Sequence, residues 1–248
     1  MIARPDEMRF MKMKTFWADM ASVEVQTHHM KNFFVLLVLV SLQVHARVVS
    51  DDQGWMNLNA FISAPRDWLF YLEVQPRLID QRHYLGTTLY RAAIGRTVAP
   101  GLSLWVGYGF IEYSHPRDTY EDRPFLQVLH THALEKFKLT NRTRWEGRFL
   151  ENPTPPTSRL RHLVRLQWRA PTAWPIAGVV WDEWFWNSNS TKGGPQEGFD
   201  QNRAFVGMGW LFGEDEKNIM EAGYMNQYVN GALDRRNHVI AGQLTVRY

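Results

Sequence analysis

From about residue 47 to the end of the chain, polar and apolar residues alternate with a period of two. Because successive side chains of a β-strand point to opposite faces of the sheet, this period predicts strands with one apolar and one polar face. The clearest segment is 139–150, where one face carries Arg142, Arg144, Glu146 and Arg148 and the other carries Thr143, Trp145, Gly147 and Phe149. A row of charges behind an apolar row is costly in a soluble core, so the pattern favours a wall whose apolar face meets lipid.

The alternation recurs along the whole of 47–248, and helical periodicity is absent. We expect strands at 55–63, 68–78, 84–96, 102–113, 123–134, 139–150, 160–168, 176–187, 199–212, 217–229 and 237–248. The connections alternate between short turns and longer loops, which is typical of an all-β, antiparallel, up-and-down transmembrane β-barrel of about 10–12 strands. Bacterial single-chain barrels have even strand numbers. Either 55–63 is therefore not a wall strand, or one strand is missing from this set.

An apolar run at residues 33–42 precedes the alternating region. It follows Met30 and Lys31 and ends in Val44-His45-Ala46, a small-residue cleavage motif. Because the run is about half of the roughly 20 residues that a membrane-spanning helix needs, it indicates a cleavable secretory signal over 30–46, cut after Ala46, and a barrel over 47–248. The alternative is a buried strand or helix of a soluble domain. Residues 1–29 carry acidic residues that signals seldom contain, so we expect an extra segment there and translation from Met30.

Composition narrows the possible classes of protein. A mean hydropathy of −0.37 excludes a bundle of membrane-spanning helices but not a barrel, whose strands alternate in polarity. The absence of Cys removes disulfides, zinc–thiolate sites and cysteine nucleophiles, and a net charge of +3 is too small to favour nucleic acid as a partner. Downstream of residue 46, Arg outnumbers Lys 19 to 4. Arginine suits charges confined in a polar interior.

The last predicted strand places Ile240, Leu244, Val246 and Tyr248 on one face, and the chain stops on that aromatic residue. This resembles the carboxy-terminal signature of outer-membrane proteins that the barrel assembly machinery recognises. We therefore expect that machinery, through the Tyr248 segment, and outer-membrane lipid as partners. The expected location is the outer membrane of a Gram-negative bacterium.

Five motifs resemble those of the barrel family catalogued as domain of unknown function 2490. They are Trp105-Val106-Gly107-Tyr108, 142–149 (RTRWEGRF), 181–187 (WDEWFWN), 199–203 (FDQNR) and 223–228 (GYMNQY). The resemblance runs from about Trp55 to Tyr248. It implies an outer-membrane barrel from a Gram-negative source, and it implies no activity.

The polar faces, if they point inward, bring twelve charged residues to one lumen. These are Glu73, Arg77, Arg91, Arg142, Arg144, Glu146, Arg148, Arg161, Arg165, Glu183, Arg203 and Glu221. One hypothesis is a narrow pore or binding channel for acidic solutes, because basic side chains in a narrow polar lumen lower the barrier for anions. The alternative is that Arg and Glu from different strands pair and fill the interior, leaving a plugged barrel with a binding or envelope-maintenance role.

Other candidate chemistry is weaker. A barrel lipid hydrolase would need a Ser–His pair, and no motif selects one, so we expect no enzymatic activity. His130 and His132 share a strand face, but no third ligand can be placed, and we expect neither a metal nor a cofactor. Trp184 and Trp186 also share a face, which favours an interfacial girdle over a carbohydrate platform. Asp182 falls on the same side, which predicts that this segment lies near a rim or that the register is shifted.

Overall fold

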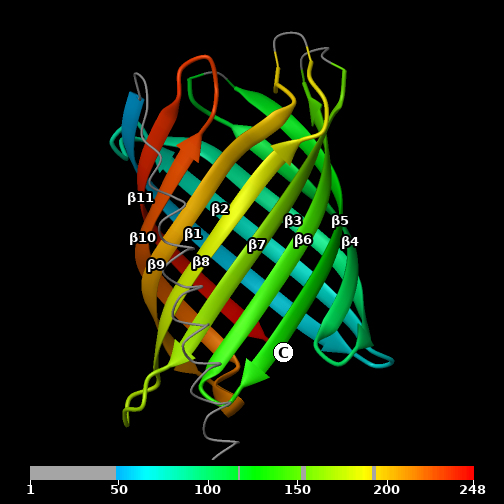
Figure 1. The fold of residues 1–248 in the computed structure, drawn as a ribbon, viewed down its shortest axis with the longest axis vertical. Coiled ribbons are helices and arrows are strands. Elements are labelled where there is room, and N and C mark those ends of the chain that lie inside the picture. The colour runs from blue at the N-terminus through cyan, green and yellow to red at the C-terminus, as the bar shows by residue number, and fades with distance from the viewer. Residues whose placement is uncertain (1–48, 117, 152–154, 192–193) are drawn as a thin grey trace, which may run out of the picture. The chain divides into compact units, whose positions relative to one another are not determined.

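The computed structural model describes residues 49–116, 118–151, 155–191 and 194–248, so the predicted signal and the segment before it lie outside the described residues. Eleven β-strands form a closed barrel (Figure 1). They are β1 (Val49–Ala64), β2 (Trp68–Ile79), β3 (Tyr84–Ala99), β4 (Leu102–Tyr113), β5 (Thr119–Leu134), β6 (Phe137–Leu150), β7 (Thr157–Arg169), β8 (Ile176–Asn187), β9 (Gly198–Phe212), β10 (Asn218–Val229) and β11 (Arg235–Arg247). A short 3₁₀ helix, η2 (Glu214–Glu216), precedes β10. No helix in the described ranges is long and apolar enough to cross a membrane.

Each of the eleven predicted segments overlaps one strand, and the all-β barrel is confirmed. The expectation of an even strand number was wrong. Segment 55–63 is part of a wall strand, and β1 pairs directly with β11, so the circuit closes without a twelfth strand. An odd number of alternating strands forces this closing pair to be parallel, with Val49 opposite Arg235 and Phe61 opposite Arg247, whereas every other pair is antiparallel.

The predicted alternation of polarity is present in space. In β6, Arg144, Glu146 and Arg148 are buried inside the barrel while Trp145 and Phe149 are exposed on its outer face. The inner face of the barrel is largely polar and charged, and the outer face is largely apolar. The period of two in the sequence therefore produces a barrel that is polar inside and apolar outside, the reverse of a water-soluble protein.

The barrel has two distinct ends. We call the end that carries the connections after β1, β3, β5, β7 and β9 the turn side, and the opposite end the loop side. In Figure 1 the turn side lies at the bottom, where β11 ends, and the loop side lies at the top. Both β1 and β11 run from the loop side to the turn side, as their parallel pairing requires.

Asp182 is an exception on the apolar outer face. It pairs in register with Val164 of β7 and Ala204 of β9, so the register that places it outward is correct. It lies in the middle of β8, however, so the expected position near a rim was wrong. Asn202 on β9 donates a hydrogen bond to its carboxylate, which gives the charge a partner within the wall.

Candidate functional site in the barrel lumen

All twelve charged residues expected on the polar faces lie on the inner side of the wall. Nine of them are buried: Glu73, Arg91, Arg144, Glu146, Arg148, Arg161, Glu183, Arg203 and Glu221. Arg142 and Arg165 line the internal cavity described below, and Arg77 lies over the ring of the buried Trp55, 3.7 Å from its centroid. Strands on all sides of the barrel contribute, so the lumen gathers charges from residues up to 148 positions apart in the sequence, from Glu73 to Glu221.

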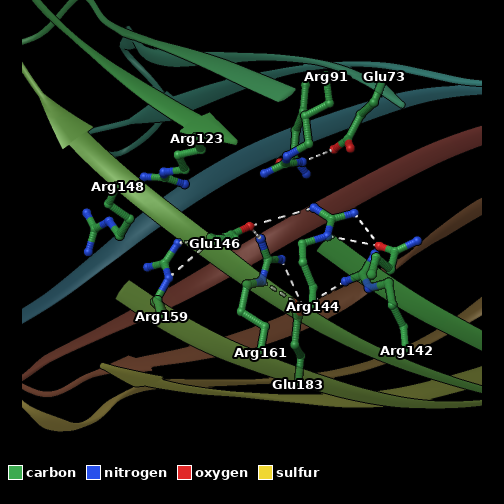
Figure 2. A network of polar contacts seen from close by, with 12 residues as sticks. Glu73, Arg91, Arg123, Arg142, Arg144, Glu146, Arg148, Arg159, Arg161 and Glu183 are labelled. Carbon is green, nitrogen blue, oxygen red and sulfur yellow. Dashed lines mark hydrogen bonds and ion pairs between the residues drawn. The ribbon is translucent and has the colours of Figure 1, made fainter. Parts of the chain in front are cut away.

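The centre of the lumen is a network of arginines around two glutamates (Figure 2). Glu146 accepts hydrogen bonds from Arg161 at 2.6 Å and from Arg159 at 2.8 Å. Glu183 accepts from Arg142 at 2.7 Å and from Arg161 at 2.8 Å. Arg161 therefore bridges the two carboxylates, and each carboxylate is held by two guanidinium groups. Such charge-assisted bonds are short and directional, which fixes the side chains across the lumen.

A second cluster lies closer to the loop side. Glu121 on β5 accepts hydrogen bonds from Arg123 and Arg148, with shortest distances of 2.7 Å and 2.6 Å. The phenol of Tyr113 donates to the same carboxylate at 2.9 Å. Arg159 of the central network, which donates to Glu146, also donates to Asp200 of β9 at 3.0 Å. Glu121, Arg123, Arg148 and Arg159 are buried, Glu121 with 0% exposure, whereas Tyr113 and Asp200 are partly exposed.

Some arginines of the lumen are held by aromatic rings and amides as well as by carboxylates. The Arg144 guanidinium lies 4.1 Å from the centroid of Phe125 and donates twice to Gln127, at 2.7 and 2.9 Å. Arg203 lies over both Trp55 and Phe185. Cation–π contacts of this kind stabilise desolvated cations. They allow the interior to hold more arginines than its carboxylates alone could pair.

A cavity of about 380 Å³ occupies the turn-side half of the lumen. Its wall includes Ser103, Thr131, Lys138, Gln167 and Arg247, which lie near the turn-side ends of their strands. Its inner end is formed by members of the network: Glu73, Arg91, Arg144, Arg161, Glu183 and Arg203. The loop-side residues Glu121, Arg123, Arg148 and Arg159 do not line it. The arrangement is a cavity on one side and a packed ionic layer on the other.

Several lumen residues escaped the sequence reasoning. Glu121 and Arg159 lie just outside the predicted segments 123–134 and 160–168, and Lys138 lies just outside 139–150. Arg123 and Arg247 lie inside predicted segments on the inward phase but were not singled out. Extending each alternating segment by two residues at its ends would have found Glu121, Lys138 and Arg159, whereas Arg123 and Arg247 could have been found from the inward phase alone. For the three residues outside the predicted segments, the prediction was wrong about where the strand ends and right about the phase of the alternation.

The histidines in the described part of the chain lie on several different strands and loops. His130 and His132 lie side by side on β5 with ring centroids 4.2 Å apart. Within the described ranges there is no group of three or more His, Cys, Asp or Glu side chains placed to hold a metal ion. His162 is hydrogen-bonded to Thr143, and His238 to the phenol of Tyr224.

Comparisons with known proteins agree with the resemblance drawn from the motifs. The family model described as protein of unknown function (DUF2490) matches residues 52–238. An uncharacterized protein of Methylorubrum extorquens is 32% identical over 220 residues, covering 86% of this chain and 94% of that protein. No solved structure matches.

Proposed function

The chain belongs to the DUF2490 family of unknown function, and we propose that it is an outer-membrane barrel that binds an acidic solute from one end without conducting ions. The observation that carries this proposal is the contrast within one lumen between a packed ionic layer on the loop side and a cavity on the turn side. A through-pore would need a continuous aqueous path, and the burial of the mutually paired side chains on the loop side supports a path that is blocked there.

The outer face supports the membrane part of the proposal. Large apolar side chains are exposed on strands around the barrel, with exposed fractions of 64% for Leu126, 62% for Met208 and 58% for Ile240. Soluble monomers seldom expose apolar surface that is continuous over an entire wall. An apolar outer band around a polar interior is the arrangement of membrane barrels.

The charge of the cavity supports an acidic solute. Its wall carries eight cationic side chains: Arg91, Lys138, Arg142, Arg144, Arg161, Arg165, Arg203 and Arg247. It carries three carboxylates: Glu73, Glu183 and Glu221. A concave site with one dominant sign of charge concentrates ligands of the opposite sign.

Conductance in planar lipid bilayers tests the closed lumen. We expect the purified protein to give no steady ion steps at any voltage. As a matched control, the double substitution Glu146→Ala with Arg161→Ala removes the bridge at the centre of the layer while leaving Arg159 paired with Asp200 and Glu183 with Arg142. We expect that variant to give measurable steps. Anion-selective steps from the unaltered protein would overturn the proposal in favour of a pore.

A substitution at the middle of the outer face tests the membrane location separately. Leu126 lies in the middle of β5 and faces outward. An arginine at a lipid-facing midplane position costs about 2–4 kcal/mol of barrel stability, whereas on a water-exposed surface it is nearly neutral. We expect Leu126→Arg to lower the free energy of unfolding measured in phospholipid vesicles, with Leu134→Arg, an outward-facing position at the end of the same strand, as the milder control. Equal stability of the Leu126→Arg variant and the unaltered protein would contradict a membrane-facing wall.

A further inference from the structure

Three cations gather around one carboxylate in the turn-side part of the cavity. Lys138 of β6, Arg165 of β7 and Arg247 of β11 all line it, together with Glu221 of β10. Arg165 donates to both oxygens of Glu221, at 2.5 and 2.9 Å. Lys138 and Arg247 are close enough to Arg165 and Glu221 to interact with them electrostatically. The group has a net formal charge of +2.

Two of these cations have no carboxylate partner of their own. Within the described part of the chain Lys138 makes no ion pair, and the guanidinium of Arg247 donates to the backbone carbonyl of Lys217, at 2.7 Å, and to no carboxylate. Both are partly exposed, as is the side chain of Arg165 at 16%, whereas the side chain of Glu221 is only 2% exposed. A solute entering from the turn side therefore meets the cations while the carboxylate stays covered.

Apolar side chains lie beside this group in the same cavity. Phe61, Leu163 and Ile219 line the wall, and the guanidinium of Arg247 lies 5.4 Å from the centroid of Phe61. Cavities of roughly 300–1,000 Å³ with apolar walls and a few convergent polar groups are typical of small-molecule sites, and this one has about 380 Å³. The size and the partly apolar wall favour an occupant with an apolar part over a purely hydrophilic ion.

We propose that Lys138, Arg165 and Arg247 form a binding site for the acidic head, phosphate or carboxylate, of a small amphiphilic anion whose apolar body lies against Phe61, Leu163 and Ile219. The proposal deepens the proposed function and rests on its solute-binding part. Arginine presents paired donors that match the geometry of phosphate and carboxylate oxygens, and Lys138 adds a point charge. Glu221 orients Arg165 and at the same time opposes the bound anion, so it sets the affinity.

Calorimetric titration of the purified full-length protein in a neutral maltoside detergent tests the site. Three probes separate the parts of the ligand: 2-naphthyl phosphate carries both an acidic head and an apolar body, inorganic phosphate only the head, and 2-naphthol only the body. We expect 2-naphthyl phosphate to bind at least ten-fold more tightly than either of the others. Its affinity should fall as ionic strength rises, because the attraction is partly screened. Equal affinity for inorganic phosphate would overturn the amphiphile, and equal affinity for 2-naphthol would overturn the anion site.

Variants assign the binding to these residues. The double substitution Lys138→Gln with Arg247→Gln should weaken 2-naphthyl phosphate binding at least ten-fold. Arg169→Gln, which alters an exposed pair with Glu216, should leave it unchanged. Glu221→Gln should strengthen binding several-fold, and this gain cannot be mistaken for misfolding. Affinity that is unchanged in the double variant would overturn the proposal.

The outcomes remain separable from those of the proposed function. Conductance steps from the unaltered protein would reject the closed lumen and leave the titration valid, because the titration uses no membrane. Absence of naphthyl phosphate binding would reject the site and leave the closed barrel intact.

Discussion

The two halves of the lumen are built from the same residue types by the same alternation, yet they differ in what they leave open. On the loop side each buried carboxylate is shared by two arginines, as Glu121 is by Arg123 and Arg148, and the side chains fill the interior. On the turn side Lys138 and Arg247 converge on a single carboxylate that Arg165 already occupies. The number of carboxylates available to the cations, rather than the number of arginines, distinguishes the packed layer from the cavity.

One substitution, Glu→Gln, made at three depths would measure this difference. The largest effect is expected at Glu146, which is 0% exposed and holds Arg159 and Arg161. Removing its charge takes one of two carboxylate partners from each of these buried guanidinium groups, so that Arg159 keeps only Asp200 and Arg161 only Glu183. Breaking buried pairs in this way costs about 3–5 kcal/mol. Urea unfolding in detergent, followed by tryptophan fluorescence, should show a large drop in the midpoint. A midpoint close to that of the unaltered protein would mean that the layer is not held by its ion pairs.

An intermediate effect is expected at Glu221. Its carboxylate is covered, but its partner Arg165 reaches the cavity and can be hydrated once the pair is broken. Glu221→Gln should therefore lower the free energy of unfolding by about 1–3 kcal/mol in the same assay. A loss as large as that of Glu146→Gln would show that the turn-side half is as tightly packed as the loop-side half.

The smallest effect is expected at Glu216 on the turn-side rim. Its pair with Arg169 has two hydrogen bonds of 2.8 and 2.9 Å, but the Glu216 side chain is 40% exposed. Solvent screens such a pair, and its removal seldom changes stability measurably. Glu216→Gln should leave the urea midpoint unchanged within error. A clear drop of the urea midpoint in Glu216→Gln would show that the loss of stability at the three sites does not follow their solvent exposure.

Much of the barrel follows from the sequence because a period of two needs only local information. The phase of the alternation in residues 142–148 places four charges inside without any knowledge of neighbouring strands. The pairing of those charges is different. Arg142 of β6 reaches Glu183 of β8 across the intervening β7, and this depends on strand register, barrel radius and the length of the arginine side chain. No local pattern contains these quantities.

The same distinction explains the two corrections. The parity of the strands is a property of the closed circuit, and it is decided by the pairing of β1 with β11 rather than by any one segment. The central position of Asp182 depends on Asn202, twenty residues later in the sequence, which supplies its hydrogen-bond partner in the neighbouring strand. The phase of the alternation can be read from one strand. The closure of the barrel and the hydrogen-bond partner of Asp182 depend on several strands.

The parallel seam has a consequence for redesign by circular permutation. In a barrel with an even number of strands, the start of the first strand and the end of the last strand lie at the same rim, so a short linker can join them. Here the start of β1 and the end of β11 lie at opposite rims, and the 13 residues of β11 at about 3.3 Å each separate them by roughly 40 Å. A permuted chain would need a linker that runs the full height of the wall. Such a linker would itself add one more crossing and restore the even parity that the natural sequence lacks.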